Sequence, residues 1–175
     1  LFGVLYIVFS RFVRDDISHY GLFLLLGVIL WRFFAAGTAK ALQSIVDNLE
    51  IINKIYFPRY IFVIADSLSV LVTFLLELLI FTVFYIIFTG SVTFSLLWLI
   101  PAAAVEFIFI LGLGFFLSAV YPFFRDLLPA WQVLLKVGFF LTPVFYSVKK
   151  VPLKFFNLYM LNPLSVLMTF LRNIL

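Results

Sequence analysis

Long, mostly apolar stretches constrain this chain more than any other feature of its sequence. The longest covers residues 60–88, whereas about 20 apolar residues already suffice for a helix to cross a bilayer. Only 11% of the residues are charged and 66% are hydrophobic, far from the roughly 25% of charged residues in a soluble domain. The sequence therefore predicts an all-α integral membrane protein.

Similar stretches divide the chain into about five predicted spans, the first of them partial. The partial span ends near Ser10, and the others cover residues 22–37, 60–88, 96–120 and 127–148. We expect Thr142 and Pro143 to kink or break the last span, because proline removes a helical hydrogen bond. The closing region, residues 149–172, contains Pro152 and Pro163 and is predicted to form short interfacial or re-entrant helices.

Residues 38–57 differ from the apolar stretches on either side. Their apolar members recur at helical spacing between Leu42 and Ile52, with polar residues opposite. This pattern predicts an amphipathic helix that lies on the membrane surface. Pro58 would separate it from the following span, since proline disfavours a helical conformation in the residue before it.

The composition excludes several classes of protein. The chain has no cysteine and only one histidine, His19, so catalysis by cysteine, a histidine-based triad and a metal cluster are not expected. A glycine-rich phosphate loop is absent from the sequence, so any nucleotide chemistry is expected in another chain. The scattered net charge of +4 offers no basic patch for nucleic acid.

Five ionisable side chains fall within the predicted spans: Arg32, Asp66, Glu77, Glu106 and Lys136. A charge that faces lipid at the bilayer centre costs about 2.5–3.5 kcal/mol on insertion scales. Arg32 and Asp66 lie near predicted span ends, so we expect them to extend towards the interface. Two interpretations of the deeper Glu77 and Glu106 remain open, either a pairing with Lys136 that stabilises the helices or the polar lining of a substrate path.

A charged pair, Arg125-Asp126, follows the fourth predicted span. Asp126 is expected to cap the next helix by accepting backbone N–H bonds, although contact with a cytoplasmic partner is compatible with that role. Lys and Arg residues are spread almost evenly over the two sides of the predicted membrane domain, so they do not decide its orientation.

Several short blocks together resemble the permease subunits of ABC-2 type transporters that export lipid-linked polysaccharide. The blocks cover residues 27–34, 44–48, 52–59, 125–126, 141–146 and 161–164, the last ahead of Arg172. The resemblance implies a single ABC-2 type transmembrane domain over residues 1–175, with six spans in the full protein. The N-terminal interfacial helix and the last span would lie outside this sequence. The resemblance further implies a homodimer in the cytoplasmic membrane, in contact with membrane lipid and a separate ATPase subunit that would bind ATP and Mg²⁺.

Two sets of site residues follow from this resemblance and from the intramembrane charges. The ATPase-coupling set comprises Asp47, Asn48, Ile52, Asn53, Lys54, Tyr56, Phe57, Pro58 and Arg59, together with Arg125 and Asp126. The substrate-path candidates are Trp31, Arg32, Phe34, Glu77, Glu106, Lys136, Tyr146 and Tyr159. Aromatic rings are included because their apolar faces suit the CH faces of sugar rings.

Three other functions remain to be considered from the sequence. An ABC-2 permease for drugs or small lipids would share the same fold. A channel or carrier would function without any ATPase. A membrane-embedded transferase would need carboxylates or histidines clustered at one interface, and the sequence does not show that cluster.

Overall fold

The computed structural model describes residues 20–54, 58–90, 94–146 and 162–174. Every regular element in these ranges is helical. The elements are α2 (Tyr20–Asp47), α3 (Leu49–Lys54), α4 (Tyr60–Thr89), the 3₁₀ turn η1 (Phe94–Trp98), α5 (Leu99–Val120), α6 (Leu127–Leu141) and α8 (Pro163–Ile174). The predicted partial span before Ser10 lies outside the described residues.

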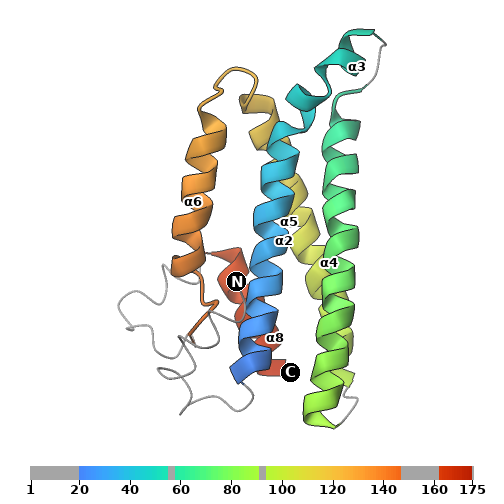
Figure 1. Cartoon of the computed structure of the whole chain (residues 1–175), viewed down its shortest axis with the longest axis vertical. Helices are drawn as coiled ribbons and strands as arrows, with labels where there is room; N and C mark the ends of the chain where they lie inside the picture. Colours follow the sequence, from blue (N-terminus) through green and yellow to red (C-terminus); the bar gives the residue numbers. More distant parts are fainter. Residues whose placement is uncertain (1–19, 55–57, 91–93, 147–161, 175) are drawn as a thin grey trace.

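Helix α2 occupies the centre of the bundle (Figure 1). Helices α4 and α6 lie on opposite sides of it, and α5 packs behind it. The short helix α3 and the connection between α5 and α6 lie at one end of the bundle, which we call the α3 end. The short helix α8 lies towards the other end, which we call the α8 end.

Three helical segments are long and apolar enough to cross a membrane, namely α2, α4 and the segment Phe94–Val120. They correspond to the predicted spans that start near residues 22, 60 and 96. The all-α membrane fold expected from the sequence is therefore confirmed for the described residues, and the chain is a multi-pass membrane protein.

Helix α6 is shorter than its predicted span. It has 15 residues, which at 1.5 Å per residue is about 22 Å, less than the bilayer core of about 30 Å. The helix ends at Leu141 because Thr142 adopts an extended conformation with φ −83° and ψ 146° and Pro143 follows. The predicted break at Thr142 and Pro143 is thus confirmed, and the extension of the helix beyond it is wrong.

The predicted surface helix over residues 38–57 is also corrected. Helix α2 continues without interruption to Asp47, and only the short α3 is a separate helix after a turn at Asn48. The physical reason is that the inner face of the α2 extension is buried against neighbouring helices instead of lying on lipid. This face comprises Thr38, Ala41, Leu42 and Ser44.

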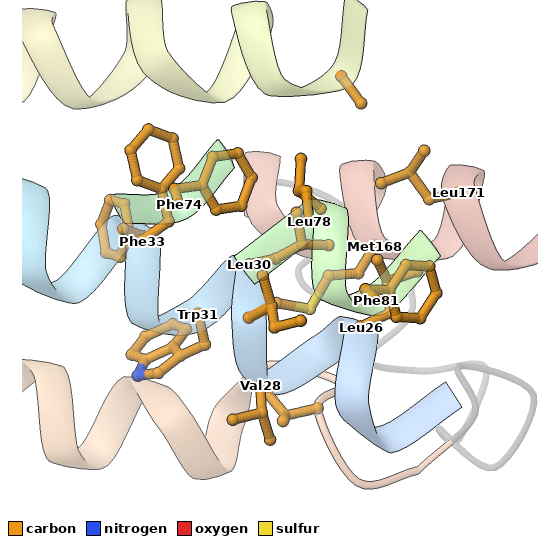
Figure 2. Packing of buried hydrophobic residues seen from close by; sticks show 14 of the residues in the cluster. Leu26, Val28, Leu30, Trp31, Phe33, Phe74, Leu78, Phe81, Met168 and Leu171 are labelled. Carbon is orange, nitrogen blue, oxygen red and sulfur yellow. The ribbon is translucent and has the colours of Figure 1, made fainter. Parts of the chain in front are cut away.

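The core surrounds α2 and is rich in aromatic contacts (Figure 2). The rings of Phe33 and Phe74 stack with centroids 4.0 Å apart and join α2 to α4. Trp31 packs 5.9 Å from Phe139 of α6. Within an apolar stretch of 18 residues in each segment, 61% of the residues are buried in α2, but only 22% in α4 and 28% in Phe94–Val120. Helix α2 is therefore the inner helix, while the other two expose broad apolar faces.

Helices α2, α4 and α5 come into close contact at Gly114 of α5. A Cβ atom there would lie 2.7 Å from the Cβ of Ala41 and 3.6 Å from Cγ1 of Val63. The methyl group of Ala41 cannot rotate away, so any side chain at Gly114 forces the helices apart. Small residues at such contacts are the usual means by which membrane helices reach close packing.

We expect Gly114→Ala to lower the stability of the bundle by about 1–3 kcal/mol, because overpacking of this contact strains the core. The matched control is Gly112→Ala in the same helix, where a new Cβ meets nothing within 4 Å. Thermal denaturation of the two purified variants in mild detergent measures the difference. Equal midpoints for both variants would contradict the proposed packing.

Candidate functional site: a polar strip on α2 and α4

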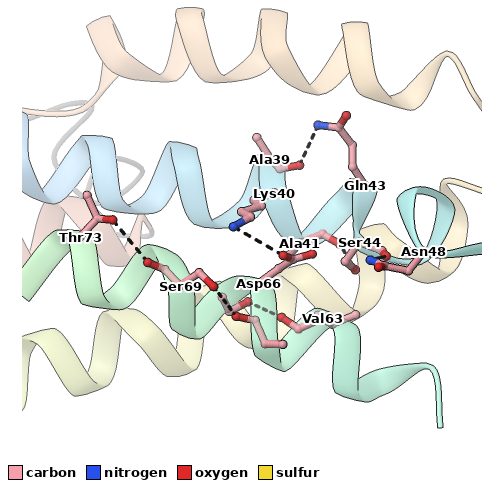
Figure 3. Close-up of polar contacts among 12 residues, drawn as sticks. Ala39, Lys40, Ala41, Gln43, Ser44, Asn48, Val63, Asp66, Ser69 and Thr73 are labelled. Carbon is pink, nitrogen blue, oxygen red and sulfur yellow. Dashed lines mark hydrogen bonds and ion pairs between the residues drawn. The ribbon is translucent and has the colours of Figure 1, made fainter. Parts of the chain in front are cut away.

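Two ion pairs join α2 to α4 on an open face of the bundle. Arg32 Nη2 lies 3.1 Å from Glu77 Oε1, and Lys40 Nζ lies 3.5 Å from Asp66 Oδ1. Figure 3 shows the second pair beside the hydroxyl groups of Ser69 and Thr73. We call the set the α2–α4 strip, and its members are Arg32, Ala36, Lys40 and Gln43 of α2 and Asp66, Ser69, Thr73 and Glu77 of α4.

Helical periodicity places these side chains on one face. The α2 members are spaced by three or four residues, and so are the α4 members, which brings each set onto one side of its helix. The two helices are antiparallel, so the earlier α2 residue Arg32 meets the later α4 residue Glu77. Ser69 donates its hydroxyl hydrogen to the Ala65 carbonyl at 2.9 Å, which leaves the oxygen lone pairs free to accept from a ligand.

The strip is open to its surroundings. The Arg32 side chain is 62% exposed and that of Lys40 48%, against 21% for Glu77 and 25% for Asp66. Arg32 lies about 18 Å along the helix from its start at 1.5 Å per residue, near the middle of α2. Exposure of these charges to lipid would cost about 2.5–3.5 kcal/mol each at the bilayer centre, so the strip requires a polar neighbour.

The expectation that Arg32 lies near a span end is wrong, because α2 continues to Asp47. Asp66 does lie near the start of α4, where it pairs with Lys40 of α2. Lys136 is exposed on α6 and forms no ion pair with either glutamate in the described part of the chain. Glu77 instead pairs with Arg32, because antiparallel α2 lies directly beside α4.

Glu106 stands apart from the strip. It lies on the inner face of α5 with only 2% of its surface exposed. Neither carboxyl oxygen has a hydrogen-bond partner among the described residues. A buried carboxyl group without a partner is destabilising. The structure therefore does not bring Glu106 together with Arg32 and Glu77.

The predicted aromatic platforms are mostly structural. Trp31 and Phe34 are only 8% and 7% exposed, and Phe34 stacks on Phe109 of α5 at 5.8 Å. The expectation that these two rings offer open faces to a substrate is therefore wrong in this structure. Tyr146 is half-buried and donates a hydrogen bond to the Leu141 carbonyl at 3.2 Å, and Tyr159 lies outside the described residues.

The predicted ATPase-coupling residues gather at the α3 end (Figure 1). Asp47, Pro58, Arg59, Arg125 and Asp126 are all exposed there. Helix α3, with the half-buried Ile52, and the turn between α5 and α6 thus face the same side of the membrane, although they are far apart in the sequence. The coupling role itself stays a prediction.

One residue at the α3 end, Asp126, does not have the capping role expected from the sequence. Asp126 has helical angles of φ −72° and ψ −7° and makes no side-chain cap bond, so the predicted cap is wrong. Asn48 donates a hydrogen bond from its side chain to the Ser44 carbonyl at 2.8 Å and stabilises the end of α2. The side chains of Asn53 and Lys54, and the whole of Tyr56 and Phe57, lie outside the described residues.

Exposed apolar side chains at the same end are not among the residues predicted from the sequence. Phe123 and Phe124 are 82% and 67% exposed beside Arg125, and Ile51 of α3 is 46% exposed. An aromatic pair next to a charged turn is a signal that could have been noticed, because Phe123 and Phe124 follow α5 and are not covered by the bundle. Exposed apolar groups of this kind favour contact with another protein.

A second missed residue is Arg172 of α8. Its guanidinium donates hydrogen bonds to the carbonyl oxygens of Pro143, Val144 and Phe23 and lies 3.5 Å from the centre of the Phe23 ring. Non-helical backbone at membrane depth needs such partners, because lipid offers none. Arg172 therefore ties the broken end of α6 to α2 and α8.

The chain is similar to curated O-antigen export permeases. It is 30% and 29% identical over 163 residues to two proteins named O-antigen export system permease protein RfbA from Klebsiella pneumoniae, covering 93% of this chain and 63% of each relative. It is 26% identical over 165 residues to the protein of the same name from Myxococcus xanthus, covering 93% of this chain and 64% of that relative. The chain thus spans less than two thirds of the length of these relatives. No family model matches it.

We expect Glu106→Met to raise the stability of the bundle by about 1–3 kcal/mol, because methionine of similar size removes a buried group without a hydrogen-bond partner. The control is Glu77→Met, which leaves Arg32 without its partner and should not stabilise. Thermal denaturation in detergent compares both with the unchanged chain. Destabilisation by Glu106→Met would show that its carboxyl group has a partner in the folded protein.

Proposed function

We propose that this chain, a relative of the O-antigen export permeases along 93% of its length, is the transmembrane permease subunit of an ATP-driven polysaccharide exporter. It would move lipid-linked polysaccharide across the cytoplasmic membrane. The similarity over nearly the whole chain is the observation that carries the proposal. The helical membrane fold and the gathering of charged and aromatic residues at the α3 end support it.

The energy source in this proposal is a separate ATPase subunit. The sequence has no phosphate-binding loop, so ATP and Mg²⁺ would be bound by the partner. The α3 end presents Ile51, Phe123 and Phe124 as apolar contacts and Arg59, Arg125 and Asp126 as charged ones. A mixed apolar and charged surface beyond the membrane spans suits a soluble protein partner.

A displacement of α3 would reach the membrane through α2. Only the turn at Asn48 separates the two helices, and α2 is packed tightly against α4 and α5 around Gly114. Closely packed helices move as rigid bodies instead of deforming continuously. The three helices would therefore transmit ATPase motion along their length to the α8 end.

The polar α2–α4 strip favours a polysaccharide over a drug or a small lipid. An apolar cargo needs no charged or hydroxyl groups on its route, whereas a sugar chain exchanges hydrogen bonds with them. The strip faces one side only, so a second permease copy is the natural source of the opposite side. We therefore propose a homodimer as the complete transport unit.

Affinity purification of the full-length protein in mild detergent, followed by mass spectrometry, tests the energy source. We expect a stoichiometric partner that contains a phosphate-binding loop, since nucleotide must bind outside this chain. Accumulation of intracellular polysaccharide on depletion of the permease is the companion measurement. A folded and active protein that reproducibly lacks such a partner would instead favour a channel or carrier.

Cysteine crosslinking tests the docking surface. The sequence has no native cysteine, so single replacements report one position each. We expect Ile51→Cys and Phe124→Cys at the α3 end to crosslink to the ATPase subunit with a short bifunctional reagent. The matched control is Val166→Cys on α8, which is similarly exposed but lies towards the opposite end. Crosslinking from Val166→Cys alone would contradict the placement of the partner.

A further inference from the structure

We propose that the α2–α4 strip is the wall of a hydrated passage that takes an uncharged, hydroxyl-rich chain. The choice of occupant rests on the proposed export function, whereas the hydration of the strip does not. The inference begins from depth. Arg32 and Glu77 lie near the middle of two helices that have 28 and 30 residues, and both helices are candidate membrane spans.

The ion pairs leave hydrogen-bonding capacity on the strip. A guanidinium group has five N–H donors, and the contact of Arg32 with one oxygen of Glu77 uses only part of them. Arg32 is nevertheless 62% exposed. Lipid tails offer no acceptors for the remaining donors. The exposed side of the pair is therefore suited to water and to polar groups of a ligand.

The surface chemistry does not suit direct packing of another helix. Membrane helices associate through small residues that allow close approach, as α2 and α5 do at Gly114. The strip instead carries the long charged side chains of Arg32, Lys40 and Glu77. These side chains would hold a neighbouring helix away and keep space for water.

The charge balance indicates the class of ligand. Arg32 and Lys40 are positive and Asp66 and Glu77 are negative, so their formal charges sum to zero. Ion-selective routes are lined by charges of one sign, whereas this strip alternates donors with acceptors. Ser69 and Thr73 add hydroxyl oxygens between the two pairs. A neutral chain with many hydroxyl groups can exchange hydrogen bonds with both kinds of group.

The opposite flank of α4 provides the contrast. Leu68, Val72 and Leu75 are 45%, 60% and 50% exposed, and they belong to a purely apolar flank that suits lipid. Val72 and Thr73 are neighbours at the same depth, and both are exposed. They differ in the face on which they lie, so they make a matched pair.

Thiol accessibility tests hydration. This sequence contains no native cysteine, so each variant of the full chain carries one new thiol in it. Thr73→Cys and Ala36→Cys on the strip, and Val72→Cys on the apolar flank, are treated with a hydrophilic, membrane-impermeant methanethiosulfonate. We expect Thr73→Cys to react at least tenfold faster than Val72→Cys. Ser69→Cys serves as a second strip position if Thr73→Cys does not elute as a folded protein.

Two results would overturn the proposal that the α2–α4 strip is a hydrated wall. One is reaction of Thr73→Cys no faster than Val72→Cys. The other is a strip that is shielded from the reagent and forms disulfides between copies on oxidation, which would identify it as a packed interface. Labelling needs no ATPase, so it tests hydration separately from the proposed function. If the strip is labelled rapidly but the protein has no ATPase partner, the hydrated wall stands and the proposed function is refuted.

Protection of Thr73→Cys from labelling tests which class of ligand occupies the passage. We expect maltoheptaose, a neutral hydroxyl-rich chain, to slow labelling of Thr73→Cys at least twofold, and a galacturonate oligomer of matched length to slow it less. Greater protection by the charged oligomer, or none by either, would overturn the assignment of the ligand class. Labelling of Val72→Cys should be unchanged by both.

Discussion

The bundle depends on the close contact of three helices at Gly114. The missing side chain allows α5 to approach Ala41 of α2 and Val63 of α4 within the reach of a single methyl group. This contact makes α2 the inner helix and directs its charged face away from α5. The two ion pairs and the stacked rings of Phe33 and Phe74 then fix how α2 faces α4.

The membrane imposes a second constraint, since polar groups within it need partners from the protein or from water. The chain meets this need in different ways. Arg172 donates to three carbonyl groups around the broken end of α6, and two ion pairs join α2 to α4. Among the described residues, the buried carboxyl group of Glu106 and the hydroxyl group of Ser165 find no hydrogen-bond partner. A destabilising group of this kind often has a functional reason.

These features give the helix bundle two different ends and a polar face between them. The α3 end presents charged and aromatic side chains beyond the spans, the α8 end contains non-helical backbone held by Arg172, and the α2–α4 strip extends between them. Helix α2 belongs to all three regions. A motion received at one end would therefore reach the strip and the other end together, which the proposed coupling to a separate ATPase would require.

The sequence by itself determined the membrane class, three of the long spans and the break at Thr142 and Pro143, because length, hydropathy and proline chemistry are local properties. The order of short blocks along the chain was also sufficient to indicate a resemblance to polysaccharide-export permeases, and the chain is similar to curated O-antigen export permeases. Only the tertiary structure decided that α2 continues through residues 38–47, that Glu77 pairs with Arg32 and not Lys136, and that Trp31 and Phe34 lie in the core. Those outcomes depend on which helix faces meet, and apolar helices that are nearly uniform in sequence do not encode their neighbours in any local pattern.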